Sequence, residues 1–245
     1  DGSLTIAHAL AQKGLRVVGV PKTIDNDLDK TSTTFGFDTA VAFATESLDR
    51  LHSTAESHQR IMVVEMMGRY AGWIALHAGI SGGAHAILIP EIPFRLEKVA
   101  EKIRERERHG RTYSVVVVAE GARPADGERS IQAPAEIGHA ERLGGIGERV
   151  SQALQQLTGK DSRTVVLGHL LRGGSPTTFD RLAALRFGAA AVRALDEGHS
   201  GVMVALAYPN VNYVPLAEVA GRMKGVPLDC DTLMTGRDLG ISFGD

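Results

Sequence analysis

The chain has 245 residues, of which 43% are hydrophobic and 23% charged, and its formal net charge at pH 7 is -2. This length can bury one large core or two modest ones, and the charge argues against binding nucleic acid through bulk positive charge. No apolar run is long enough to span a bilayer and the single cysteine, Cys230, excludes an intramolecular disulfide, so we expect a soluble cytoplasmic protein with no membrane or nucleic-acid partner.

The first three residues, DGS, form a helix-start signal that has no strand in front of it. Ser3 is expected as the N-cap of a helix whose apolar residues include Leu4, Ile6 and Leu10. Unpaired backbone N–H groups and the helix dipole favour phosphate at such a start, although DGS alone is a weak signal. Because the upstream strand is missing, we expect the chain to be truncated at its N-terminus.

The segment VPKTIDND follows an apolar, β-branched run that begins at Leu15 and predicts a buried strand. In a parallel α/β sheet the strand ends open onto the ligand crevice. The paired Asp25 and Asp27 beside Lys22 would suit phosphate and metal chemistry there. The local composition is equally typical of a solvated turn, because Asp, Asn and Pro are common in loops.

Beyond this segment, apolar runs and three- or four-residue periods predict strands that alternate with helices. Helices are expected over residues 35–58, 69–79, 95–109, 147–157, 179–196 and 216–223. Strands are expected over residues 61–66, 86–91, 113–119, 164–168 and 202–207. This alternation indicates parallel, doubly wound sheets, and the strands suffice for two of them. The stretch 121–144 has no clean period and is expected to be an extended surface excursion.

Polar side chains recur at one end of the expected strands. Those at or just past a C-terminal strand end are Asp25, Arg69, Glu120, His169 and Arg172. This is the edge at which such folds bind ligands. Arginines bind phosphate oxygens in a forked geometry and a carboxylate accepts hydroxyl hydrogens, so the set suits a phosphorylated sugar.

Two further arginines, Arg60 and Arg163, stand at the opposite, N-terminal ends of their strands. Groups at opposite strand ends cannot easily line one pocket within one subunit. Either these two arginines are structural, or they reach a site in a neighbouring molecule.

These motifs resemble those of the phosphofructokinases. DGS, PKTIDND, FGFDTA, the arginine of SHQR, MGRYAGW, LGHLLRGGSP and FDR follow one another in the family's order through nearly the whole chain. The resemblance implies two doubly wound, Rossmann-like parallel-sheet domains, the first of them incomplete. Residues 1–36 and 174–245 would be the remainder of a nucleotide-binding domain, and residues 37–173 a sugar-phosphate-binding domain.

The resemblance also implies roles around the phosphoryl donor. Asp1, Gly2 and Ser3 would belong to a GGDGS loop whose first two glycines precede the chain. Asp1 would lie near a magnesium ion, and the backbone of this loop near the nucleotide phosphates. Asp25 would be the base that takes the proton from the sugar 1-hydroxyl, and Asp27 would support the metal.

On the sugar side, the resemblance implies contacts along both domains. In chain order they are Thr23, Ile24, Asp25, Arg60, Met67, Gly68, Arg69, Glu120, Arg163, His169 and Arg172. Thr23 would contact the transferring phosphoryl group, and Met67 to Arg69 with Glu120 would hold the fructose ring and the transition-state charge. His169 and Arg172 would bind the 6-phosphate. Arg60 and Arg163 would complete that phosphate site in a neighbouring subunit of a homotetramer or homodimer.

The implied activity is that of an ATP-dependent 6-phosphofructokinase, which uses Mg²⁺ and converts fructose 6-phosphate to fructose 1,6-bisphosphate in glycolysis. Two positions disagree about the donor. Gly2 resembles ATP users and leaves room for a nucleotide, whereas Lys22 resembles pyrophosphate users. We give the space at Gly2 more weight than the positive charge of Lys22, because a lysine side chain can swing away. We therefore expect ATP as the phosphoryl donor.

Three other functions are considered beside this one. A pyrophosphate-dependent fructose 6-phosphate 1-phosphotransferase is the alternative within the family. A non-catalytic regulatory paralogue would be expected to lose Asp25 or Arg69, and the chain has both. A lipid or dinucleotide kinase with a GGDG-type loop would not call for PKTIDND or for the segment from His169 to Arg172.

Overall fold

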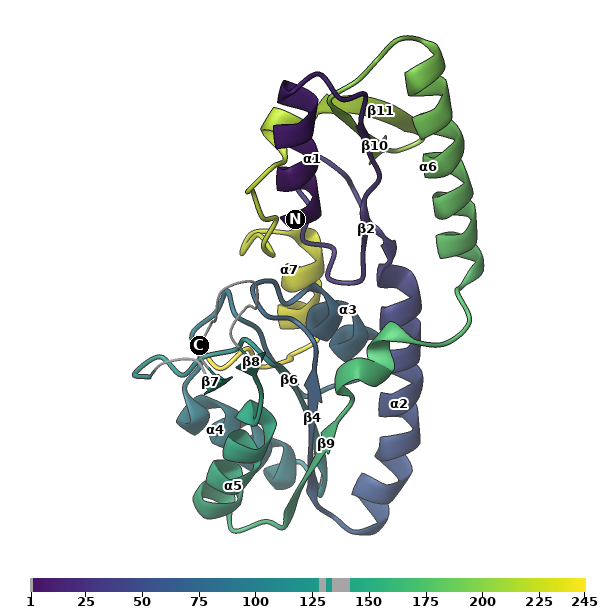
Figure 1. Cartoon of the computed structure of the whole chain (residues 1–245). Coiled ribbons are helices and arrows are strands. Elements are labelled where there is room, and N and C mark those ends of the chain that lie inside the picture. The colour runs from purple at the N-terminus through teal and green to yellow at the C-terminus, as the bar shows by residue number, and fades with distance from the viewer. Residues whose placement is uncertain (1, 128–130, 134–141) are drawn as a thin grey trace. The chain divides into compact units, whose positions relative to one another are not determined.

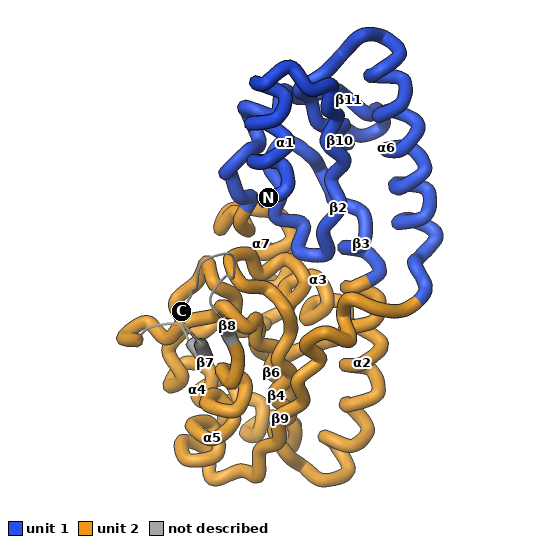
Figure 2. Tube along the Cα trace, viewed as in Figure 1, with its two compact units in different colours: residues 1–39, 175–224 blue, residues 40–174, 225–245 orange. Residues whose placement is uncertain are grey.

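The computed structural model describes residues 2–127, 131–133 and 142–245, and the chain folds into two compact units (Figures 1 and 2). Unit 1 consists of residues 1–39 and 175–224, and unit 2 of residues 40–174 and 225–245. The resemblance placed domain divisions after residue 36 and before residue 174, and the two compact units divide after residue 39 and before residue 175. Residues 225–245 belong to unit 2, however, and not to the first domain as the sequence analysis expected.

The reason lies in a backbone pairing beside the sheet of unit 2. Ser242 forms a parallel bridge with Ala86, and its carbonyl oxygen accepts a hydrogen bond of 2.8 Å from the backbone N–H of Ile87. Leu233 and Phe243 are buried in the same unit. The apolar residues of this segment form no long regular pattern, so its partner could not be identified from periodicity.

Unit 1 is built around a three-stranded sheet of order β1-β10-β11 and a two-stranded parallel sheet of β2 and β3. Its elements are α1 (Gly2–Gln12), β1 (Val18–Gly19), β2 (Lys22–Thr23), β3 (Phe35–Gly36), α6 (Thr178–Asp196), β10 (Val202–Ala207), β11 (Asn210–Pro215) and η2 (Leu216–Glu218). Strand β1 pairs parallel with β10, and β10 pairs antiparallel with β11.

Alternate residues of β10 supply the two cores of unit 1. Met203 and Ala205 are buried together with Leu4 of α1, whereas Val204 and Leu206 are buried together with Phe187 of α6. Because successive side chains of a strand point to opposite faces, one helix covers each face of this sheet. Figure 1 shows α1 and α6 on the two sides of the β10–β11 hairpin.

Unit 2 holds a four-stranded, fully parallel sheet of order β5-β6-β4-β9. Its elements are α2 (Phe37–Ser57, which begins in unit 1), β4 (Ile61–Met66), α3 (Trp73–Ser81), β5 (Ala86–Leu88), α4 (Leu96–Arg108), β6 (Ser114–Ala119), β7 (Ile131–Ala133), β8 (Arg142–Leu143), α5 (Ile146–Thr158), β9 (Ser162–Val166), η1 (Gly168–Arg172) and α7 (Asp231–Asp238). Every residue of β4 and β6 is buried, as expected for strands covered on both faces.

Helices α4 and α5 cover one face of this sheet. Their buried residues Val99, Ile103 and Val150 belong to one core with Val63 of β4 and Val116 of β6. Figure 1 shows α4 and α5 on one side of the strands and α2 on the other. The prediction of an α/β fold with parallel sheets is therefore confirmed.

Several expected element boundaries were wrong. Helix α1 begins at Gly2, so Ser3 lies inside its first turn and is not the N-cap. The helix expected from Arg69 begins at Trp73, and the one expected over 216–223 is only the 3-10 turn η2. Strand β11 and helix α7 were not predicted at all. Residues 128–130 and 134–141 of the expected excursion over 121–144 lie outside the described residues, and β7 and β8 within it form an antiparallel pair.

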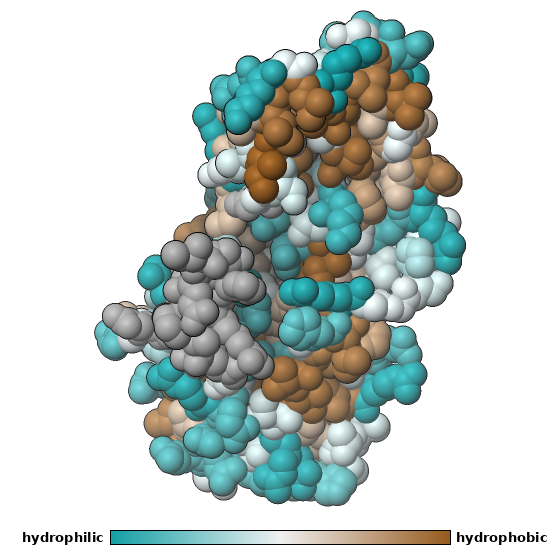
Figure 3. All heavy atoms as spheres, in the orientation of Figure 1, coloured by the Kyte–Doolittle hydropathy of each residue, from teal (hydrophilic) through white to brown (hydrophobic). Residues whose placement is uncertain are grey.

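Unit 1 exposes many apolar side chains. Figure 3 shows hydrophobic residues gathered on the visible surface of unit 1. On α6 the exposed ones include Leu182 and Val192, and Leu185 has 72% of its surface accessible. None of the described helices is long and apolar enough to cross a membrane.

A partly buried histidine links the start of β5 to β6 in unit 2. The Nδ1 atom of His85 accepts a hydrogen bond of 2.9 Å from the backbone N–H of Val115, so the ring is neutral. Burial lowers the pKa of His85 to about 3, and the positive charge of Arg106 adds to the shift. Its ring packs edge-on against Tyr113 at 5.7 Å and lies 6.2 Å from the ring of His52.

Acid should therefore destabilise unit 2. The folded-state pKa of His85 lies below the unfolded value of about 6.5, so between the two values the unfolded chain binds more protons. The free energy of unfolding should fall by about 2 kcal/mol between pH 7 and pH 5 through this group. Urea unfolding of the wild type and of His85→Gln, which stays neutral, measures the difference. Parallel stability curves for the two proteins over this range would contradict the assignment.

Candidate functional site

Three neighbouring parallel strands of unit 2 end at the same edge of the sheet. Glu120 follows β6, Met67 and Gly68 follow β4, and Leu167 follows β9. The ladder continues past the strand ends, because the N–H of Glu120 donates to the carbonyl of Met66 at 2.8 Å and that of Leu167 to Glu65 at 3.0 Å. The structure thus brings together, at the carboxyl edge of unit 2, the segments that carry the expected sugar-phosphate contacts.

Two glycines allow the loops after β4 and β6 to touch. Gly68 has a φ of +148°, which a side chain rarely adopts, and its carbonyl accepts a hydrogen bond of 3.0 Å from the N–H of Gly121. A Cβ atom at Gly121 would overlap the carbonyl oxygen of Arg69. Gly121 therefore fixes the backbone from which the Arg69 side chain extends. The sequence analysis did not single out Gly121, although it directly follows Glu120.

Basic side chains stand along this edge. His169 and Arg172 lie on the 3-10 turn η1 and are exposed, and the Nε of Arg172 donates to the sulfur of Met67 at 3.5 Å. Arg69 is partly buried, and its guanidinium lies 5.9 Å from the centre of the Tyr70 ring. Such a row of exposed and half-buried cations can bind an anion, and arginine suits phosphate because its donors form a planar fork.

A carboxylate that the sequence analysis missed holds the start of α3. The two carboxylate oxygens of Glu91 accept hydrogen bonds of 3.1 and 3.2 Å from the N–H of Gly72, and one also accepts from Val226 at 2.8 Å. These bonds close the loop that begins at Met67. Nothing in the local sequence indicates this role, because Glu91 lies 19 residues from Gly72.

Arg60 and Arg163 lie at the opposite, amino edge of the same sheet. Both pair with Asp161, which Arg60 reaches at 3.1 Å, and Arg163 also donates to the carbonyl of Ser162 at 2.9 Å. Arg163 is exposed, and the Nε of Arg60 has no hydrogen-bond partner among the described residues. Within the chain, the two arginines are brought together with each other and not with the carboxyl edge.

In unit 1 the PKTIDND segment forms β2 and a turn braced by side chains. The N–H of Asp25 donates to Thr23 Oγ1 at 3.2 Å, and the hydroxyl of Thr34 donates to the carbonyl of Thr23 at 2.7 Å. Asn26 adopts a φ of 52° and is 4% exposed. Its Oδ1 atom accepts a hydrogen bond of 3.1 Å from the N–H of Thr34. Ile24 and Asp25 are partly buried, so the solvated-turn alternative describes this segment poorly.

Asp27 has a feature that fits a cation ligand. Its Oδ1 atom is buried and has no hydrogen-bond partner among the residues that the structure describes. Buried polar atoms are nearly always paired, so an unpaired carboxylate oxygen is suited to a bound ion. The described residues contain no cluster of three His, Cys, Asp or Glu side chains that could hold a metal ion. Binding of Mg²⁺ does not require such a cluster, because this ion is commonly bound by one or two carboxylates together with substrate phosphates.

The expected donor loop is only partly described. Gly2 and Ser3 form the exposed first turn of α1, where unpaired N–H groups suit an anion. A Cβ atom at Gly2 would meet no atom within 4 Å. Lys22 is exposed on β2. Asp1, the expected metal ligand, lies outside the described residues.

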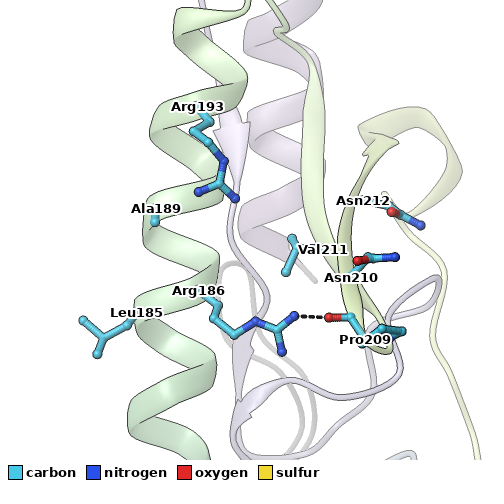
Figure 4. Close-up of a pocket in the computed structure, with 8 residues that line it drawn as sticks. All are labelled: Leu185, Arg186, Ala189, Arg193, Pro209, Asn210, Val211 and Asn212. Carbon is cyan, nitrogen blue, oxygen red and sulfur yellow. Dashed lines mark hydrogen bonds between the residues drawn. The ribbon is translucent and has the colours of Figure 1, made fainter.

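A separate hollow of about 660 Å³ lies between α6 and the β10–β11 hairpin of unit 1 (Figure 4). Arg186 and Arg193 line it from α6, and Val211 from β11. Arg186 donates to the carbonyl oxygen of Pro209, and Asn210 and Asn212 turn their side chains away from α6. The hollow contains none of the residues expected from the sequence to bind substrate.

The chain matches curated proteins over its whole length. An ATP-dependent 6-phosphofructokinase of Chloroflexus aggregans is 55% identical over 245 residues, which are 100% of the chain and 67% of that protein. ATP-dependent 6-phosphofructokinase 2 of Streptomyces coelicolor is 52% identical over 231 residues, or 94% of the chain and 67% of that protein. The chain thus spans about two thirds of the length of these relatives.

Solved structures of similar fold carry the same family name. A pyrophosphate-dependent phosphofructokinase from Marinobacter aquaeolei superposes with a TM-score of 0.78 at 26% identity, covering 98% of the chain and 64% of that structure's chain. A phosphofructokinase from Saccharomyces cerevisiae gives a TM-score of 0.74 at 31% identity, covering 89% and 31%. The phosphofructokinase family model matches residues 1–195. The chain belongs to the phosphofructokinase family.

Proposed function

We propose that the protein is an ATP-dependent 6-phosphofructokinase, a phosphotransferase that moves the γ-phosphoryl group of ATP to the 1-hydroxyl of fructose 6-phosphate. The observation that carries this proposal is the 55% identity, over the whole chain, to a relative named for that activity. The carboxyl edge of unit 2 supports it chemically. There Glu120, Arg69 and Arg172 follow three adjacent strands and provide a carboxylate and cations for a sugar phosphate.

Asp25 is the proposed base. In phosphoryl transfer the protein mainly positions the groups and stabilises charge, and a carboxylate accepts the proton of the attacking hydroxyl. Thr23 Oγ1 accepts a hydrogen bond from the backbone N–H of Asp25. This hydrogen bond orients the backbone that carries the Asp25 carboxylate. Asp1 and Asp27 would hold Mg²⁺, which when bound neutralises charge on the phosphoryl oxygens. Thr23 and Ile24 would flank the transferring group.

The sugar phosphate is assigned to unit 2. His169 and Arg172 would bind the 6-phosphate, since both are exposed basic groups on one 3-10 turn. Glu120 would accept a sugar hydroxyl, while Arg69 would stabilise the charge that develops on the transferring group. Gly68 and Gly121 set the backbone geometry of this edge, which allows Met67 to contact the sugar ring.

ATP is the proposed donor, although Lys22 resembles pyrophosphate users. Two relatives with 52% and 55% identity are named as ATP-dependent, whereas the pyrophosphate-dependent structure is only 26% identical. The physical argument is that Gly2 leaves space beside the first turn of α1, where a nucleotide must extend beyond its phosphates.

The enzyme is proposed to act as a homo-oligomer. Arg60 and Arg163 are held together by Asp161 at the edge of unit 2 opposite to the other sugar-phosphate contacts. In a symmetric assembly such a pair can serve the site of a neighbouring subunit, which would complete its 6-phosphate contacts.

Replacing the base should affect turnover more than binding. Asp25→Ser should lower kcat by about 10² to 10⁴-fold, with a change of less than about threefold in the KM for fructose 6-phosphate. Steady-state kinetics of the full-length protein with ATP measure both constants. Asp29→Ser removes a carboxylate from the same turn and should leave kcat near the wild-type value. Near-normal turnover by Asp25→Ser would exclude Asp25 as the base.

Removing a phosphate ligand should have the opposite pattern. Arg172→Ala loses a charge-assisted contact that is made in both the ground and transition states, so the KM for fructose 6-phosphate should rise about 10- to 100-fold. The value of kcat should change little. Arg108→Ala, an exposed arginine at the end of α4, is the matched control. An unchanged KM in Arg172→Ala would remove this residue from the phosphate site.

Donor choice can be tested at Gly2, because an added Cβ atom there would meet no atom within 4 Å among the described residues that are not its chain neighbours. Gly2→Asp should lower kcat/KM for ATP by about tenfold or more, since a carboxylate would crowd and repel the nucleotide phosphates. Activity with pyrophosphate should not fall in parallel. Equal use of ATP by both proteins would show that room at Gly2 does not decide the donor.

A further inference from the structure

A lysine distant in sequence lies inside the turn that carries the two acidic residues of unit 1. The Nζ atom of Lys224 donates to Asn26 Oδ1 at 3.1 Å, to the carbonyl of Thr31 at 2.9 Å and to that of Ser32 at 3.4 Å. Three acceptors surround an ammonium group that has three N–H bonds. The backbone N–H of Lys224 also donates to the carbonyl of Asp27 at 2.8 Å.

These contacts lie on both sides of the turn. Asn26 lies near the start of the segment between β2 and β3, and Thr31 and Ser32 lie nearer its end, so the lysine ties the two parts of this segment together. Asn26 is the junction, because its Oδ1 atom accepts from both Lys224 and the N–H of Thr34. Its left-handed backbone conformation carries a steric cost that surrounding contacts must offset.

The lysine is partly buried and lies near two carboxylates. Burial lowers the pKa of Lys224 to about 8, and the carboxylates of Asp29 and Asp27 partly oppose this shift. Deleting a shielded charged donor while its acceptors remain is destabilising, because those acceptors then lose their hydrogen bonds. Removing this side chain would deprive Asn26 Oδ1 and the carbonyls of Thr31 and Ser32 of this donor.

We propose that Lys224 is the positioning residue of the turn from Asp25 to Thr34, and that it holds the Asp25 and Asp27 carboxylates in place by tethering Asn26. In this proposal the lysine acts through Asn26 and takes no part in the chemical step. The kinetic part of this proposal rests on the proposed function, in which Asp25 is the base. The structural part, a turn that is ordered by Lys224, does not depend on the reaction.

Hydrogen exchange of the full-length protein tests the structural part. Lys224→Met removes the charge and the donors but keeps the chain length, and it should speed amide exchange at least tenfold at Asp25 and Thr34. Exchange in the β4–β6 ladder should stay unchanged. Lys30→Met is the matched control, because Lys30 lies in the same turn with an exposed side chain. Exchange that is unaltered in the turn, or raised equally throughout the protein, would overturn the tether.

Kinetics test the functional part. Because a displacement of about 1 Å in a catalytic group can cost on the order of 10²-fold, Lys224→Met should lower kcat by about 10- to 100-fold. The KM for fructose 6-phosphate should change by less than about threefold, and Lys224→Arg should recover most of kcat. A wild-type kcat in Lys224→Met, or an equal loss in Lys224→Arg, would contradict the proposal.

A second variant tests the same hydrogen bond by changing its acceptor, Asn26. Asn26→Gly removes the shared acceptor while tolerating the left-handed backbone, so the test remains if Lys224→Met does not fold. If Lys224 acts through Asn26, the double variant should lose no more activity than the more impaired single variant. If the fold-losses in kcat of the two single variants multiply in the double variant, Lys224 does not act through Asn26. If the wild-type protein phosphorylates no sugar, the proposed function fails, and hydrogen exchange still decides whether Lys224 orders the turn.

Discussion

The geometry of the proposed sugar site depends on the register of one parallel ladder. Met66 pairs with Ala119 and Glu65 pairs with Val166, so β6, β4 and β9 end within about one residue of each other. The next residues of all three strands must therefore emerge at the same edge. A shift of one residue in any of these strands would turn its side chains to the other face and separate the cations from Glu120.

Unit 1 positions its acidic residues by a different means. The turn after β2 has little sheet around it, because β2 and β3 are only two residues long. Its order comes from hydrogen bonds made by Thr23, Asn26, Thr34 and Lys224. Polar networks of this kind specify one geometry when every member is satisfied, and they loosen when one member is lost. Asp25, the proposed base, is held in this way and should be sensitive to changes well outside its own immediate contacts.

The sequence was most informative where apolar runs are continuous. The strands Ile61–Met66 and Val202–Ala207 were predicted with their observed limits, because short continuous apolar runs of this length favour buried strands. Strand β11 was missed because NVNYVP mixes polar and apolar residues on an edge, and α7 because DTLMTGRD is short and polar. Positions at strand ends indicated Arg69, Glu120 and Arg172, whereas their detailed roles came from the family resemblance and remain proposals.

Contacts between distant parts of the chain could not be predicted. Lys224 and Asn26 are 198 residues apart, and no local pattern near Lys224 indicates a partner. The same holds for Glu91 with Val226, which are 135 residues apart. Such contacts depend on which distant segments of the chain the fold brings together. A single sequence indicates this arrangement only through its hydrophobic patterns, and polar residues are not part of these patterns.

The apolar side of α6 has a practical consequence for work on the isolated chain. Leu182, Leu185 and Val192 present methyl groups directly to water, whereas the cations of unit 2 keep their hydration. Salts such as ammonium sulfate strengthen apolar association while they screen charge. Salting-out should therefore favour contacts through exposed apolar residues such as those of α6 over contacts through the arginines.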